Sequence, residues 1–318
     1  MNIVGLESLV YGVDDVDAAI RFHEDWGLET LERGSRGADF ALADGTTVHL
    51  RQADDPGLPP ARIHWEHLGA STVREVVWGV DGPATLAAIA AELATDREVG
   101  ADDDGTIHSS DELGSAIAFR VSRRVPESLD LPATNTVGSN PRRNVPAEGA
   151  ARRAARPRRL GHLVYWVPGD LEAAAAFYID RLGFRVTDLV GEGGIFMRCA
   201  GTTDHHNMLL QRQGDYLGFQ HVAYEFRDFD EVMQLGAHME ARGWRTNVGP
   251  LRHNIGSSLS WYLWNPAGGL AEAYCDMDYA DDDWQIRTFD PSDPSFYGHA
   301  WNARPEQAGR RPADLHED

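Results

Sequence analysis

The sequence predicts an α+β protein in which two tandem copies of one module follow each other along the chain. The first observation is that residues 6–31 align with residues 160–189: each is a short apolar strand, an amphipathic helix, a glycine and a second strand. Two later pairs also align, namely 73–93 with 219–243 and 115–121 with 269–275. Each half therefore follows the order β-α-β-β-β twice, which indicates an internal duplication.

The length and composition agree with two modules of ordinary size. The chain has 318 residues, and 42% of them are hydrophobic, so each module can bury a core. We expect an N-terminal module at 1–121, a linker at 122–157, a second module at 158–280 and a tail at 281–318. The exposed sheet edges of such modules favour a homo-oligomer.

The charge and the apolar pattern exclude several partners. The formal net charge is −21, which argues against binding to nucleic acid or to an anionic membrane surface. No apolar run is long enough to cross a bilayer, and the first residues do not resemble a signal peptide. The two cysteines, Cys199 and Cys275, cannot build a disulfide framework, so a cytoplasmic location is expected.

The remaining elements are predicted in chain order. In the second module a helix is expected at 171–182, capped near Asp170 and ended by Gly183. The linker is rich in Pro, Asn and Arg, which favours an extended connector whose 152–159 arginine cluster pairs with acidic surface. The tail is expected to pack back on the body through its aromatic residues, which are Trp284, Phe289, Phe296, Tyr297 and Trp301.

A hairpin near the end of the second module carries an isolated carboxylate. Residues 258–264 alternate and are aromatic-rich, residues 265–269 supply a turn, and residues 270–275 form a second, apolar strand. Glu272 lies in this last strand. Burying a lone glutamate is costly unless it is paired or bound to a metal, so partners for Glu272 are expected from other strands.

Comparison of the two halves identifies those partners. His162 aligns with Ser8 of the first half, His221 with Glu75, and Glu272 with Ala118 or a neighbour. A single histidine in a strand is more often a hydrogen-bonded core residue than a ligand. Three such residues on equivalent strands, all absent from the sister module, instead predict a facial triad of two histidines and one carboxylate. Such a triad suits iron(II) and leaves coordination positions open.

At this point the sequence resembles a known family, the two-module type I extradiol ring-cleavage dioxygenases (catechol 2,3-dioxygenase-like) of the vicinal oxygen chelate superfamily. The most specific segment has His253, seven residues, Trp261-Tyr262, two residues, Asn265-Pro266, one residue, Gly268, three residues and Glu272. Trp261 departs from the aliphatic residue or Phe usual before the tyrosine. Residues 250–252 depart from the usual glycine. The resemblance covers both modules and implies that the paired units of each form a curved mixed sheet.

The resemblance also implies roles for individual residues. His162, His221 and Glu272 match the ligands of Fe(II), with Mn(II) as the alternative metal. In the segment DHHNMLL, His206 matches the acid–base histidine; we prefer it to its neighbour His205, which would face the opposite side of a strand. Residues that contact the substrate are matched by Tyr262 and His253. The first module is expected to have no metal site.

The function that follows is a non-haem iron(II)-dependent extradiol dioxygenase of aromatic hydrocarbon catabolism. It would cleave a catecholic substrate next to its vicinal diol and incorporate both atoms of O2. The alternative within the same superfamily is a glyoxalase-like metal-dependent isomerase or lyase, which usually has a fourth protein ligand. A non-enzymatic protein that sequesters a ligand is a third possibility, although such proteins generally lack metal ligands.

Other candidate groups have simpler interpretations. The histidines of His64-Trp65-Glu66-His67 are flanked by Pro-Pro and Gly, which favours a loop. The segment 102–105 resembles a calcium loop but lacks its later bidentate Glu, so an acidic turn is expected. His238 is expected on an exposed helix face. The apolar residues near the triad could line a substrate pocket or belong to the core; they are Phe196, Met197, Trp261 and Trp264.

Overall fold

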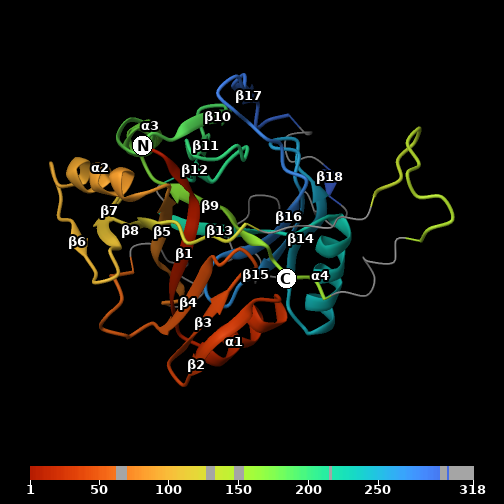
Figure 1. Ribbon diagram of the computed structural model, residues 1–318, viewed down its shortest axis with the longest axis horizontal. Coiled ribbons are helices and arrows are strands. Elements are labelled where there is room, and N and C mark those ends of the chain that lie inside the picture. Colours follow the sequence, from red (N-terminus) through yellow and green to blue (C-terminus); the bar gives the residue numbers. More distant parts are fainter. Residues whose placement is uncertain (62–69, 127–132, 147–153, 215–216, 294–298, 301–318) are drawn as a thin grey trace.

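The computed structural model describes residues 1–61, 70–126, 133–146, 154–214, 217–293 and 299–300. Within these residues the chain forms two mixed β-sheets with helices against them (Figure 1). In the same part of the chain, no helix has the length and apolar character needed to cross a membrane.

The first sheet contains eight strands among the described residues. In spatial order they are β2 (Glu29–Gly34), β3 (Gly37–Ala41), β4 (Thr47–Gln52), β1 (Ile3–Val13), β5 (Thr72–Val80), β8 (Ala116–Val121), β7 (Ile107–Ser110) and β6 (Gly100–Ala101). The central strand β5 is buried along its whole length, whereas the edge strand β2 is exposed throughout. The apolar run of residues 76–78 suits a strand that is covered on both faces.

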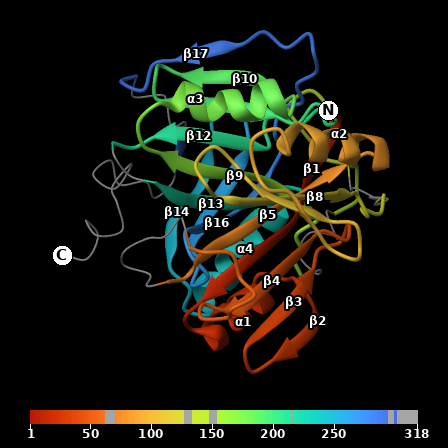
Figure 2. The same cartoon turned by 90° about the vertical axis from the view of Figure 1, so that its left-hand side faces the viewer.

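The second sheet contains ten strands among the described residues. Their spatial order is β17 (Arg287–Phe289), β10 (Arg185–Val190), β11 (Gly194–Arg198), β12 (Met208–Arg212), β9 (Arg159–Val167), β13 (Gly218–Glu225), β16 (Leu270–Cys275), β15 (Leu259–Trp264), β14 (Thr246–Arg252) and β18 (His299–Ala300). Figure 2 shows β17 at the outer edge of this sheet, beyond β10. The three strands β9, β13 and β16 lie at its centre.

Both sheets repeat one plan of strand pairing. In the first sheet β1 pairs parallel to β4, β5 pairs parallel to β8, and β1 and β5 are antiparallel. In the second sheet β9, β12, β13 and β16 repeat the same pairings. The predicted fold of two tandem modules with paired β-α-β-β-β units is therefore confirmed. The predicted hairpin is also present, as β15 and β16.

Among the described residues, four α-helices occupy the predicted places between strands, and three of them directly follow an aspartate. The helices are α1 (Val16–Asp25), α2 (Pro83–Leu93), α3 (Leu171–Ala176) and α4 (Phe229–Ala241). The side chains of Asp15, Asp170 and Asp228 each accept a hydrogen bond from a first-turn backbone N–H, the usual contribution of an N-cap residue. The helix predicted at 171–182 continues beyond α3 as a π-helical turn, Phe177–Arg181, before Gly183.

One continuous apolar core joins the two modules. Trp26 at the end of α1 lies 5.5 Å from Tyr224 of β13, measured between ring centroids, and Trp78 of β5 lies 5.2 Å from Phe184. The side chain of Tyr178 also donates a hydrogen bond across the interface to Asp111 at 2.8 Å. Because the cluster of buried apolar residues includes side chains of both sheets, each module depends on the other for burial.

The arginines at the end of the linker pair with acidic side chains, as the sequence predicts. Arg158 contacts Glu225 at 3.4 Å, and Arg159 donates from both terminal nitrogens to Asp204, each at 2.7 Å. Burial acts to raise the pKa of Asp204, but the charge and hydrogen bonds of Arg159 outweigh it and hold that pKa below its usual value. The pair therefore fixes the start of β9 to the segment just before β12.

We expect Asp204→Asn to lower the free energy of unfolding by about 1.5–3 kcal/mol at neutral pH, because Arg159 loses its two hydrogen bonds to a buried carboxylate and keeps only its contact with Glu225. A lowered carboxyl pKa stabilises the fold above the unfolded value of about 4, and this stabilisation is lost as the pH falls through the folded value. Urea unfolding at pH 7 and pH 3 should show that the gap between wild type and variant narrows in acid. The exposed Asp103→Asn is the control, and a pH-independent gap would contradict the assignment.

The described part of the tail packs back on the second module. Trp284 donates its indole N–H to the Thr187 carbonyl at 3.0 Å, and Phe289 packs against Val190 and Phe196. The three other tail aromatics, Phe296, Tyr297 and Trp301, lie outside the described residues. The expectation of a tail that covers the module is confirmed for Trp284 and Phe289.

Candidate metal centre and its neighbours

Three adjacent strands bring His162, His221 and Glu272 to one face of the second sheet. Ala223 of β13 pairs with His162 of β9 on one side and with Glu272 of β16 on the other. His221 precedes Ala223 by two residues, so its side chain projects from the same face of the strand. The register of the central strands therefore places the three predicted residues together, although they are far apart in the sequence.

The three side chains form a compact buried cluster. The Nε2 atoms of His162 and His221 each lie 3.0 Å from Oε2 of Glu272, and 3.3 Å from each other. All three residues are buried, and their potential ligand atoms lie within 4.8 Å of one another. In the part of the chain that the structure describes, no other group of His, Cys, Asp and Glu side chains is so placed to hold a metal.

The electrostatics of the cluster favour a bound cation. Burial acts to raise the pKa of Glu272, but the charges and hydrogen bonds of His162 and His221 outweigh it and hold that pKa well below its usual value. Burial also lowers the pKa of His221, which favours the neutral imidazole that a metal requires. The second carboxylate oxygen of Glu272, Oε1, is buried and has no hydrogen-bond partner among the described residues. A cation would satisfy this charged group, which is otherwise costly to bury.

Gln220 orients one of the histidines. Nδ1 of His221 donates a hydrogen bond to Oε1 of Gln220, so Nε2 is left with its lone pair toward the cluster. A polar partner on the outer nitrogen is what metal-binding histidines normally have. Nδ1 of His162 is buried with no such partner among the described residues. Gln220 was not predicted as a site residue, although it directly precedes the candidate ligand His221 in the sequence.

His253 and Tyr262 lie next to the cluster. Tyr262 pairs directly with Glu272 across β15 and β16, and its hydroxyl lies 2.8 Å from Nε2 of His253. Burial, together with the charge of Glu272, raises the pKa of Tyr262 well above its usual value, so its hydroxyl remains a donor. Burial lowers the pKa of His253 to about 4, so this imidazole is neutral near pH 7.

His206 lies against the cluster from a segment that is not a strand. Its ring centroid is 4.2 Å from that of His162 and 4.9 Å from that of Phe196. Strand β12 begins only at Met208, so the predicted alternation of a strand does not apply to His205 and His206. The expectation that His205 faces the opposite side is therefore corrected: its Nδ1 lies 2.9 Å from Nδ1 of His206.

The first module has the same strand register without the cluster. Val77 of β5 pairs with Ser8 of β1 and Ala118 of β8, as Ala223 pairs with His162 and Glu272. Glu75 stands at the place of His221, which confirms the predicted correspondence. Its Oε1 lies 2.9 Å from Nδ1 of His108. His108 pairs with Ala118 as Tyr262 pairs with Glu272, so the sister face is polar and carries a contact between His108 and Glu75 at these positions.

The other groups that the sequence singled out lie away from the cluster, outside the described residues, or beside one of its neighbours. The motif at 64–67 lies outside the described residues. Segment 102–105 is an acidic turn and His238 is exposed on α4, as predicted. Of the four apolar candidates, Phe196 contacts the ring of His206, and Met197 belongs to the core. Trp261 instead packs against the backbone of Gly236 and Gly249, and the Arg245 guanidinium lies 5.6 Å from the Trp264 ring centroid.

Comparisons with known proteins agree with this geometry. Residues 159–262 match the model of the Glyoxalase/Bleomycin resistance protein/Dioxygenase superfamily. A curated relative, metapyrocatechase 2 of Cupriavidus necator, is 28% identical over 194 residues, which span 61% of this chain and 59% of the relative.

Solved structures extend the similarity over nearly the whole chain. The Mn(II)-bound glyoxalase from Novosphingobium aromaticivorans has a TM-score of 0.72 at 22% identity, with 96% of this chain and 94% of that chain covered. The homoprotocatechuate 2,3-dioxygenase of Brevibacterium fuscum, in its anaerobic substrate complex, has a TM-score of 0.70 at 18% identity, with 94% and 92% covered. Residues 159–262 thus match the Glyoxalase/Bleomycin resistance protein/Dioxygenase superfamily, and the chain shares the fold of these solved structures over both modules.

Proposed function

We propose that this protein is a non-haem iron(II)-dependent extradiol dioxygenase that cleaves a catecholic ring next to its vicinal diol. The observation that carries the proposal is the buried cluster of two histidines and one carboxylate, flanked by His206 and Tyr262, in which Oε1 of Glu272 has no hydrogen-bond partner among the described residues. Two histidines and a carboxylate are typical of non-haem iron(II) oxygenases. The named relative, metapyrocatechase 2, agrees with this assignment.

In this proposal His162, His221 and Glu272 hold the metal, with Fe(II) preferred to Mn(II). When bound, the metal supplies adjacent coordination positions that bring the diol and O2 together. Tyr262 donates a hydrogen bond to a substrate oxygen that carries negative charge, and His253 orients the Tyr262 hydroxyl through their 2.8 Å contact. His206 accepts a proton from the substrate hydroxyl and returns it to a product oxygen.

The test is reconstitution with Fe(II) under anaerobic conditions, followed by exposure to O2 with a panel of catechols. Oxygen uptake matched by a yellow ring-fission product is the expected result. Protein that holds one iron per chain and yields no product from any catechol would contradict the proposal. Binding of no divalent metal would instead favour a protein that sequesters its ligand.

A glyoxalase-like isomerase or lyase is the second candidate, because the Mn(II)-bound glyoxalase has the same fold over 96% of this chain. Turnover in the complete absence of O2, with a preference for nickel, zinc or cobalt, would identify that class. Oxygen consumption in proportion to product would exclude it. The same reconstituted samples can be used for both assays.

His206→Ala is expected to lower turnover by about 10²–10⁴-fold, which is the usual contribution of a general acid–base group. Iron content should stay at the wild-type level, because His206 contacts the ring of His162 but is not one of the three clustered groups. Turnover under saturating catechol and iron per chain are the two measurements. His238→Ala, an exposed histidine of α4, is the matched control and should match the wild type in both.

A further inference from the structure

Behind His206, a chain of buried polar groups leads away from the metal cluster to the C-terminal tail. Nδ1 of His206 lies 2.9 Å from Nδ1 of His205, and Nε2 of His205 lies 3.0 Å from Oδ2 of Asp188. His205 and Asp188 are fully buried, and His206 is 5% exposed. Asp188 comes from β10, so this chain of contacts joins two separate segments of the second module.

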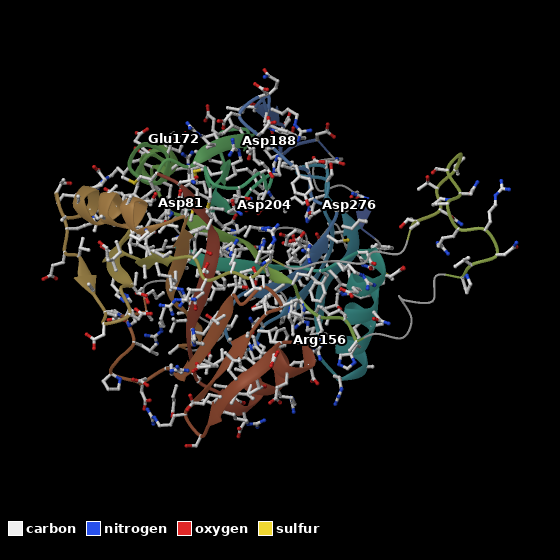
Figure 3. The ribbon with its side chains drawn as sticks, in the orientation of Figure 1. Asp81, Arg156, Glu172, Asp188, Asp204 and Asp276 are labelled. Carbon is white, nitrogen blue, oxygen red and sulfur yellow. The ribbon has the colours of Figure 1, made fainter. Side chains whose placement is uncertain are left out.

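The tail completes the surroundings of Asp188. Arg287 of β17 donates its backbone N–H to Oδ1 at 3.0 Å and its guanidinium to Oδ2 at 2.7 Å. The parallel pairing of β10 with β17 places Asp188 directly beside Arg287. The Trp284 ring lies 5.2 Å from that of His205, and its indole N–H points to the Thr187 carbonyl. Figure 3 shows Asp188 beside the tail, at the outer part of the second sheet.

This geometry determines which ring nitrogen carries the proton in each of the two histidines. Burial acts to raise the pKa of Asp188, but His205 and Arg287 outweigh it and hold that pKa below its usual value, so the carboxylate accepts hydrogen bonds only. Nε2 of His205 must therefore donate to Asp188. In a neutral His205 the other nitrogen, Nδ1, is then an acceptor. It follows that His206 donates from Nδ1 and keeps a free lone pair on Nε2.

We propose that His205 and Asp188 are positioning residues that fix the tautomer of His206, and that Arg287 and Trp284 of the tail hold them in place. The inference rests on the proposed function, in which His206 must accept a proton from the substrate. A lone pair on Nε2 is what a general base requires. The tail thereby takes part in the site, although Arg287 lies in a separate strand at the edge of the sheet and Trp284 in the segment just before it.

Asp188→Asn is the sharpest variant. An asparagine amide nitrogen can donate to His205 Nε2, which would move the His205 proton to Nδ1 and reverse the direction of its bond to His206. We expect the kcat for catechol cleavage to fall by about 10–100-fold, as for other outer groups that orient a reactive histidine. Iron content and KM should change by less than about twofold, because neither the cluster nor the substrate contacts are altered.

Substitutions of His205 separate positioning from packing. His205→Gln keeps an oxygen that can accept from His206, whereas His205→Phe fills the space and accepts nothing. If positioning matters, the Gln variant should retain at least about tenfold more kcat than the Phe variant at equal stability. Arg287→Gln should lower kcat in the same direction as Asp188→Asn. Thr288→Ala, an exposed neighbour on β17, is the control for changes in the tail.

A direct readout does not depend on activity. In metal-free protein labelled with ¹⁵N-histidine, long-range ¹H–¹⁵N spectra report which imidazole nitrogen carries the proton, and His206→Ala identifies the His206 signals. We expect His206 protonated on Nδ1 in the wild type and on Nε2 in Asp188→Asn. The same His206 tautomer in both proteins, or an unchanged kcat in Asp188→Asn, would overturn the inference. If the tautomer of His206 switches as expected but the protein cleaves no catechol, the positioning of His206 by His205 and Asp188 is supported and the proposed function is contradicted.

Discussion

Under the proposed function, His221→Ala is expected to remove stable iron binding and, with it, all ring cleavage. The imidazole is one of three clustered groups, and its Nε2 lies 3.0 Å from Glu272 and 3.3 Å from His162. Substitution of a residue that only orients a metal ligand weakens metal binding by about 10–100-fold. Loss of a ligand itself should therefore weaken metal binding by more than about 100-fold. The variant would keep only two protein ligands, His162 and Glu272, in place of three.

Metal content after desalting and the dependence of thermal stability on added Fe(II) measure this effect. A metal that binds only the folded protein stabilises it by about 2.7 kcal/mol at 100 times its Kd, so wild type should gain stability and His221→Ala should not. Glu75→Ala, the equivalent position of the first module, is the matched control and should keep the full iron content. A His221→Ala protein that retains iron at the wild-type stoichiometry would show that the cluster is not the metal site.

The repeated plan of the fold could be predicted from the sequence because the order of strands and helices along the chain follows from local sequence patterns. The alignment of the halves reproduces the register of the sheets, in which Ser8, Glu75 and Ala118 occupy the places of His162, His221 and Glu272. The π-helical turn after α3 was not predicted, since a single turn of five residues is too short to change the apolar pattern that predicts a helix. The shared core between modules was also missed, because an apolar side chain does not reveal which sheet it faces.

The metal cluster was predictable for a physical reason that also explains what was missed. A carboxylate in an apolar strand needs a partner, and that argument leads from Glu272 to two histidines. The same argument applies to Asp188 in β10, where it is followed by two apolar residues, but its partner Arg287 lies 99 positions away in the tail. His205 was misplaced because a run of polar residues before β12 was interpreted as part of the strand.

Trp26→Ala is expected to lower the free energy of unfolding by about 3–5 kcal/mol, the usual cost of truncating a buried aromatic side chain. Trp26 is fully buried at the end of α1, where it stacks on Phe22 with ring centroids 5.4 Å apart. Its ring also contacts Tyr224 and Phe226 of the second module. The cavity would therefore open at the boundary between the modules, under the strand that carries His221.

The measurement is urea unfolding of the metal-free protein, with Leu31→Ala on the exposed strand β2 as the control that should change stability by less than about 0.5 kcal/mol. Trp26→Phe separates the effect of lost side-chain volume from the effect of the buried polar group. The indole N–H is buried without a partner among the described residues, so phenylalanine reduces the packed volume but also removes an unsatisfied donor. Trp26→Phe should therefore lower the free energy of unfolding clearly less than Trp26→Ala does.

Because the core is continuous, destabilisation in the first module should also weaken iron binding in the second. A Trp26→Ala protein with reduced stability and unchanged iron affinity would show that the modules are energetically independent despite their shared core.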